Sequence, residues 1–86
     1  MRYFFHIRDG RDLPDDEGMN FNTLQDALRQ AIESAGALIK DSADHLWPGE
    51  EWSMTVTDAA GLVLCALQFT STLAPAGVGL LVQRQY

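Results

Sequence analysis

One segment of the chain repeats its apolar residues at helical spacing, and this pattern constrains the fold more than any other feature. Between about residues 24 and 42, apolar side chains recur every three or four positions, which places them along one side of an α-helix. Those residues are Leu24, Ala27, Leu28, Ala31, Ala35, Leu38 and Ile39. Thr23 and Asp26 form a capping box at the start of this segment. The sequence therefore predicts one amphipathic helix, whose apolar side must be buried against another element.

The regions on either side of this helix alternate apolar and polar residues, the pattern of strands with one buried face. The first covers residues 2–8; the second covers residues 52–57 and returns over residues 62–70 after a turn at residues 58–61. Residues 19–21 predict a further short strand. The order strand, short strand, helix, strand, strand predicts an α+β two-layer domain, in which one helix packs on a mostly antiparallel sheet of three to four strands.

The length of the chain allows only one hydrophobic core. In 86 residues, 47% of them hydrophobic and 21% charged, two separate cores would each be too small to be stable. We expect a single domain over residues 1–72, followed by a C-terminal tail over residues 73–86. Within the tail, Leu80–Val82 is strand-like and is expected to be able to add a strand to the sheet. In the connection after the helix, Trp47 is expected to pack against the core.

Charge and cysteine content limit the partners and the compartment that we expect. The formal net charge of −6 repels nucleic-acid backbones and anionic lipid head groups. The longest apolar stretch, residues 61–67, is far shorter than the roughly 20 residues that a membrane-spanning helix needs. Cys65 is the single cysteine, which fits a reducing compartment, and residues 1–8 lack the pattern of a signal peptide. We expect a soluble cytoplasmic protein without nucleic-acid or membrane partners.

No residue pattern in the sequence predicts catalysis. His6 and His45 are the only candidates for a neutral base near pH 7, and neither lies in a motif with a nucleophile. Cys65 alternates with expected core positions, which indicates a buried, inert thiol. The acidic stretch over residues 9–17 lacks the ligand spacing of a calcium-binding loop. We therefore expect no enzyme activity, no cofactor and no metal ion.

The return strand after the turn is apolar on both faces, which predicts an exposed apolar patch. A single helix covers only one face of the sheet, so apolar residues on the other face are expected to lie in water. The expected patch contains Phe4, Leu62 and Leu64 and is bordered by His6 and Arg8. We predict that a protein partner, a second copy of the chain or the chain's own tail covers it.

These observations together predict a non-catalytic protein-interaction module that binds a partner or itself through a sheet face or edge. A first alternative is an acidic inhibitor or antitoxin-like protein that binds a basic site on its partner. A second alternative is a small-molecule binder or an enzyme, which a closed pocket lined by His6 and acidic side chains would support.

The opening residues 3–10, Tyr-Phe-Phe-His-Ile-Arg-Asp-Gly, resemble a bacterial family of small domains of unknown function, known chiefly from alphaproteobacteria. The resemblance continues through residues 16–18 and 23–27 to residues 58–64 and Phe69, and the tail lies outside it. It implies a bacterial, intracellular setting, and it implies no activity, ligand or site residue.

A second resemblance is architectural. Residues 24–27 open the helix with the Leu-x-x-Ala pattern seen in HicB-like antitoxins, whose small domains also lead from strands into a helix. Those proteins usually carry a separate DNA-binding segment, and this chain has no basic helix or ribbon motif to supply one. The resemblance therefore supports only the antitoxin-like alternative.

Overall fold

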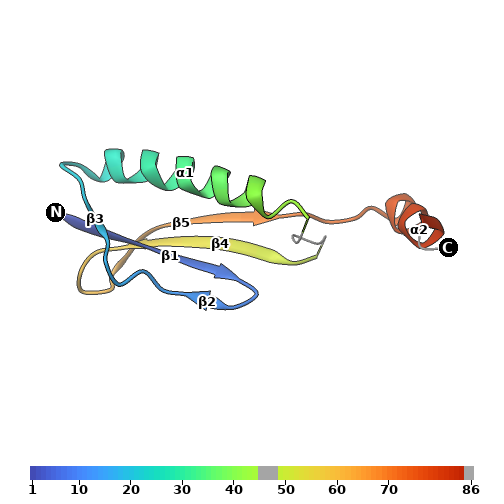
Figure 1. Cartoon of the computed structure of the whole chain (residues 1–86), viewed down its shortest axis with the longest axis horizontal. Coiled ribbons are helices and arrows are strands. Elements are labelled where there is room, and N and C mark those ends of the chain that lie inside the picture. Colours follow the sequence, from blue (N-terminus) through green and yellow to red (C-terminus); the bar gives the residue numbers. More distant parts are fainter. Residues whose placement is uncertain (45–48, 85–86) are drawn as a thin grey trace.

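The structure consists of one helix lying across an antiparallel sheet, followed by a second helix that stands apart (Figure 1). A computed structural model describes residues 1–44 and 49–84. Its elements, in chain order, are β1 (Arg2–Asp9), β2 (Asp12–Leu13), β3 (Met19–Asn20), α1 (Leu24–Asp41), β4 (Glu51–Thr57), β5 (Val63–Thr70) and α2 (Pro75–Arg84). The predicted α+β fold class is confirmed.

The sheet has five strands, and β4 lies at its centre. The main order is β2-β1-β4-β5, with β3 also pairing with β1, and every pair is antiparallel. β2 is an addition to the predicted strands, since a two-residue strand is too short to show an alternating pattern. β1 is therefore paired on both sides, whereas β5 pairs with no strand other than β4 within residues 1–44 and 49–84.

α1 begins where the capping residues predict. The hydroxyl of Thr23 accepts a hydrogen bond from the backbone N–H of Asp26 at 3.1 Å, which satisfies one of the free amides of the first turn. Lys40 lies in the last turn, where a positive charge is favourable to the helix dipole. A local signal therefore explains where this helix begins, and Lys40 stabilises its last turn.

The buried side of α1 is narrower than the predicted apolar stripe. Only Ala27, Ala31 and Ala35 are buried, while Leu24 and Leu38 are more than a third exposed. The distance between packed elements depends on the side chains at the contact, and three alanines in successive turns let the helix lie close to the sheet. Leu24 and Leu38 consequently lie at the borders of the contact between α1 and the sheet.

The core is built on β4, whose alternating residues face α1. Trp52, Met54 and Val56 are almost completely buried, as the sequence pattern predicts. Each such side chain contributes roughly 1.5–3 kcal/mol when it is removed from water. The core residues that β1 and β5 add beside them are Tyr3, Phe5, Ile7, Cys65 and Leu67.

The predicted turn between β4 and β5 is present. The carboxylate of Asp58 accepts hydrogen bonds from the backbone N–H groups of Ala60 and Leu62, both at 2.9 Å. Gly61 has a φ of +86°, a conformation that glycine adopts without strain. The turn therefore closes the hairpin with the residue types that the sequence provides for it.

A β-bulge follows this turn and changes the face on which Leu64 lies. Val56 pairs with Cys65 and Thr57 pairs with Val63, so Leu64 is an extra residue between two regular pairs. An extra residue interrupts the strict alternation of faces along a strand. Leu64 is accordingly half-buried and packs against the core.

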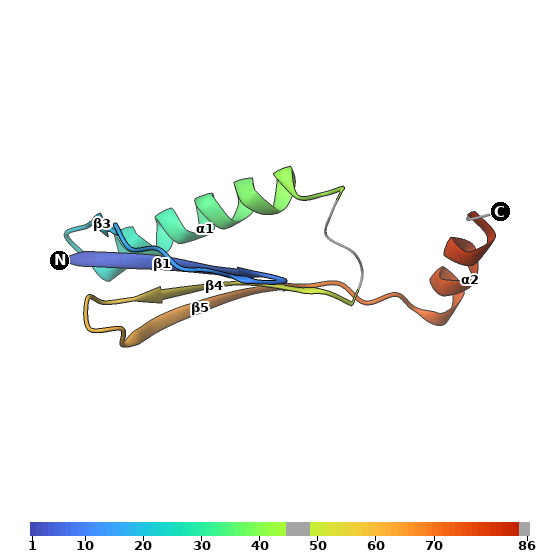
Figure 2. The ribbon, with the colours of Figure 1, turned by 60° about the horizontal axis from the view of Figure 1, so that its bottom comes forward.

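The C-terminal tail forms a helix, so the predicted strand at Leu80–Val82 is wrong. α2 stands apart from the sheet, beyond the end of β5 (Figures 1 and 2). A segment without a neighbouring strand can pair its backbone groups only within itself, which a helix does and a strand does not. Trp47 and His45 lie outside the described residues.

Because α2 projects, the molecule is elongated. Its radius of gyration is 16.0 Å and its extents are 53 × 21 × 19 Å. A compact domain of this length has a radius of gyration of about 12 Å. The compact part of the molecule is therefore α1 with the sheet, and α2 lies outside it.

Candidate functional site

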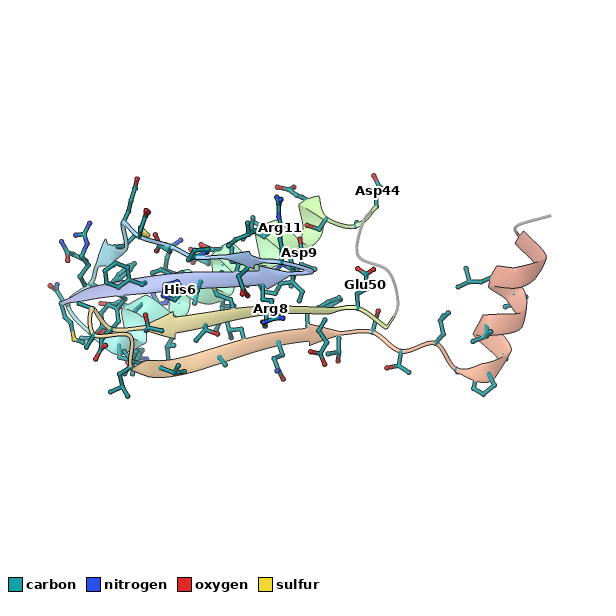
Figure 3. All side chains as sticks on the ribbon, turned by 90° about the horizontal axis from the view of Figure 1, so that it is seen from below. His6, Arg8, Asp9, Arg11, Asp44 and Glu50 are labelled. Carbon is teal, nitrogen blue, oxygen red and sulfur yellow. The ribbon has the colours of Figure 1, made fainter. Side chains whose placement is uncertain are left out.

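The face of the sheet turned away from α1, called the outer face below, carries three of the predicted interface residues. Phe4, His6 and Arg8 alternate along β1 onto this face, and Figure 3 shows His6 and Arg8 there in a view from the side opposite α1. The residues opposite them on β4 are Thr57, Thr55 and Ser53. Hydroxyl groups therefore cover the centre of this face, which is more polar than the sequence predicts.

His6 connects three segments of the chain. Its Nδ1 accepts a hydrogen bond from the backbone N–H of Asp15 at 3.1 Å. An imidazole nitrogen that accepts leaves the proton on the other nitrogen, so Nε2 donates to the Thr57 hydroxyl at 3.0 Å. The ring of Phe4 is stacked beside His6, with centroids 6.4 Å apart. Both nitrogens of His6 are thus engaged in holding the loop and β4 together.

Asp15 fastens the same loop through its carboxylate. One oxygen accepts from the backbone N–H of Phe5 at 3.1 Å, and the other accepts from the N–H groups of Glu17 and Gly18 at 3.0 and 3.1 Å. Partial burial favours the neutral acid, but the three backbone hydrogen bonds favour the ion more strongly and lower the pKa of Asp15 below its ordinary value. Asp15 is therefore a structural carboxylate that acts in its charged form.

Gly18 completes the loop because no larger residue fits. Its φ is +71°, and a Cβ atom there would lie 2.8 Å from the backbone oxygen of Tyr3 and 2.9 Å from the ring of Phe4. Both the backbone conformation and the space thus require glycine. The loop is held tightly against β1.

The structure brings together only some of the predicted interface residues. Phe4 and His6 are half-buried and border an open hollow of about 200 Å³ beside the β4–β5 turn. Leu62, at the end of that turn, is 64% exposed. Arg8 is exposed and forms an ion pair with an aspartate in β2, whereas Leu64 packs against the core because of the β-bulge. The predicted patch is therefore not continuous across the outer face.

The chemistry available around His6 is that of a structural network. Both ring nitrogens and both carboxylate oxygens of Asp15 have partners within the chain. Within residues 1–44 and 49–84, no three His, Cys, Asp or Glu side chains lie together as a metal site requires. The geometry indicates that His6 and Asp15 hold the loop in place.

None of the helices that the structure describes is both long enough and apolar enough to span a membrane.

The open edge of β5 is the second candidate site, and its composition is unusual for an edge. In the described part of the chain no strand pairs with its outer side. Its sequence, Val-Leu-Cys-Ala-Leu-Gln-Phe-Thr, contains no charged residue and no proline. Exposed edges in monomeric proteins are usually protected by charges, prolines or short length, because their free N–H and C=O groups pair readily with another strand. This eight-residue edge has none of these three protections, and its one irregularity is the β-bulge at Leu64, near its start.

An aliphatic flank of α1, defined by Leu28 and Ile32, faces the same side of the molecule. Gln30, on the opposite flank, borders a hollow together with Phe21, near β3. Leu28 and Ile32 therefore lie on the β5 side of the helix, and Ile32 is 62% exposed. Phe69, at the end of β5, is 40% exposed on the face that α1 covers only in part. The apolar stripe expected from the sequence included Leu28 but not Ile32, and the spacing of four residues between them was the available signal.

The fold and these two surfaces define a small α+β domain in which β2 and β3 cover the outer side of β1, called the closed edge below, and no described strand covers the outer side of β5, the open edge. Comparison with protein families finds that DUF6894, a domain of unknown function, matches residues 2–70. The chain belongs to this family. The match ends at the last residue of β5, so α2 lies outside it. Neither the comparison with curated proteins nor the comparison with solved structures gives a match.

Proposed function

We propose that this chain is a protein-interaction module that binds an extended strand along the open edge of β5. The observation that carries the proposal is the eight-residue edge without charge or proline. Added strands gain affinity from main-chain hydrogen bonds and specificity from the side chains on either face. In this chain Phe69 lies on the strand itself and is 40% exposed, and Ile32, on the flank of α1 toward β5, is 62% exposed.

The edge is a better candidate than the patch expected from the sequence. Phe4 and His6 are already engaged with the loop that Asp15 holds, so a partner that used them would have to compete with existing contacts. The backbone groups on the outer side of β5 have no such engagement among the described residues. Strand addition at β5 requires no rearrangement of the domain.

We also propose a cytoplasmic location. Cys65 is the only cysteine and lies on β5 itself, so the chain cannot form an internal disulfide. A chain whose single cysteine forms no internal disulfide fits a compartment that keeps thiols reduced.

The proposal is tested by placing a charge on the edge. Ala66 is exposed near the middle of β5 on the outer face, and Ala37 is an exposed alanine on α1. The full chain is immobilised, and the proteins it captures from the cells that express it are compared for wild type, Ala66→Lys and Ala37→Lys. We expect Ala66→Lys to lose its captured protein and Ala37→Lys to keep it. Equal capture by all three chains, or no capture by a monomeric wild type, would contradict the proposal.

A further inference from the structure

We propose that the strand bound at the β5 edge is β5 of a second copy of this chain. This inference rests on the proposed function and names the partner. Two antiparallel strands are related by a twofold axis perpendicular to their sheet, so pairing β5 with itself would join the two five-stranded sheets into one. Both α1 helices would then lie on the same face of the combined sheet.

The distribution of charge favours a second copy. All twelve acidic residues lie in residues 1–58, and no charged residue occurs between Asp58 and Arg84. Two copies with a net charge of −6 repel each other wherever their acidic regions approach. β5 and most of α2 form the uncharged part of the molecule, so this is where two copies meet without opposing like charges. A strand without charges is also compatible with its own antiparallel image.

Exposed apolar side chains on α2 and at the start of β5 would enlarge the interface beyond the paired backbones. A stable interface of standard size buries about 800 Å² on each partner, more than a single strand edge provides. α2 leaves the end of β5 with Val78 47% and Leu80 61% exposed, and it stands apart from its own sheet (Figure 2). In antiparallel pairing, this end lies beside the start of β5 in the other copy, where Leu62 and Val63 are 64% and 58% exposed. α2 would therefore cover apolar surface of the second copy.

Charge pairing across the twofold axis gives a test that only self-association passes. Light scattering of the full chain is expected to give twice the mass of the 9.5 kDa chain. Ala66→Lys and Ala66→Glu each place like charges near the axis, and each variant alone is expected to be monomeric. An equimolar mixture of the two variants is expected to recover the dimer, because opposite charges then face each other. Ala37→Lys is the matched control and should remain dimeric.

A second variant tests the part played by α2. Leu80→Glu places a charge on the exposed helix, and we expect the dimer Kd to rise about tenfold or more if this leucine is buried between copies. Circular dichroism of each variant checks that the domain is still folded. An unchanged Kd would contradict the role of α2, and the pairing of β5 would then be judged by the mixing experiment alone.

The outcomes separate this inference from the proposed function. A monomeric wild type overturns the dimer, and so does a mixture of Ala66→Lys and Ala66→Glu that stays monomeric. If a monomeric wild type nevertheless captures a protein that Ala66→Lys loses, the edge binds a different partner and the proposed function stands. If the dimer forms and survives Ala66→Lys, the copies meet elsewhere, and both the inference and the role of the edge are wrong.

Discussion

The two edges of the sheet differ in how their backbone groups are satisfied. On the outer edge of β1, β3 pairs with Arg2 and Tyr3, and β2 pairs with Ile7 and Arg8. Between them the Asp15 carboxylate accepts the N–H of Phe5, so a side chain replaces a strand. The outer edge of β5 has neither a strand nor a side-chain partner among the described residues.

The backbone groups on the outer side of β1 are paired by short strands and by a side chain. Among the described residues, those on the outer side of β5 are not. The closed edge needs a loop that contains a charged carboxylate and a glycine in the left-handed region, and a histidine on β1 that accepts a hydrogen bond from the loop backbone. β5 is longer than β2 and β3 together and has no equivalent loop beside it in the described residues. We therefore interpret the open edge as the surface left for binding.

The largest effect is expected where the closed edge is tightest. Gly18→Ala forces a Cβ atom to within 2.8 Å of the Tyr3 backbone oxygen at a φ of +71°. We expect the free energy of unfolding in urea to fall by about 2–4 kcal/mol, from strain and crowding together. Gly10→Ala is the control, because its φ is +73° but nothing lies near its Cβ position, and it should cost about 1–2 kcal/mol. Equal losses for both variants would show that crowding at the loop is unimportant.

The next effect is expected at the carboxylate that replaces a strand. Asp15→Asn keeps the size of the side chain but removes one accepting oxygen and the charge, so at least one backbone N–H loses its partner. We expect a loss of about 1–3 kcal/mol in the free energy of unfolding at pH 7. Asp16→Asn, at the exposed neighbouring position, should change it by less than about 0.5 kcal/mol. Similar values for both variants would argue against the closing role of Asp15.

The stability of the closed edge should also depend on pH. The pKa of Asp15 is lower in the folded chain than its ordinary value of 3.8, so the ionised carboxylate stabilises the fold at pH values above 3.8. As the pH falls through the lowered pKa, this stabilisation is lost. The difference in unfolding free energy between wild type and Asp15→Asn should therefore shrink below pH 3.8, as followed by urea unfolding at several pH values. A difference that stays constant to about pH 2 would contradict the assignment.

The smallest effect on stability is expected at the open edge. Ala66→Lys adds a charge at an exposed position that no described residue covers, so the monomer should lose less than about 0.5 kcal/mol. Urea unfolding at a protein concentration too low for association measures this value. A large loss would mean that Ala66 supports the fold, and the open edge would then be part of the domain's own structure.

Local chemistry explains why much of the fold was predictable. The capping pair Thr23 and Asp26 marks the start of α1, and the alternation of Trp52, Met54 and Val56 marks a half-buried strand. Both signals act over a few residues, so they are present in the sequence before any long-range contact forms. The interface at Phe4, His6, Arg8, Leu62 and Leu64 stays a prediction; of these residues, Phe4 and His6 border one hollow, and Leu64 packs with the core.

The sequence by itself thus determined α1 and the strands of the central domain other than β2, through capping, periodicity and the Asp58 turn. Only the tertiary structure decided which strand lies at an edge, because that depends on the order in which strands pair. It also decided the face of Leu64, since a single extra residue in the β5 register shifts the alternation. The helical form of the tail was likewise decided there, since no strand in the described part of the chain lies beside Leu80. The strand order and the β-bulge depend on contacts between residues distant in the chain, and the form of the tail depends on the lack of a neighbouring strand among the described residues. The pattern within one segment does not specify which other segment lies beside it.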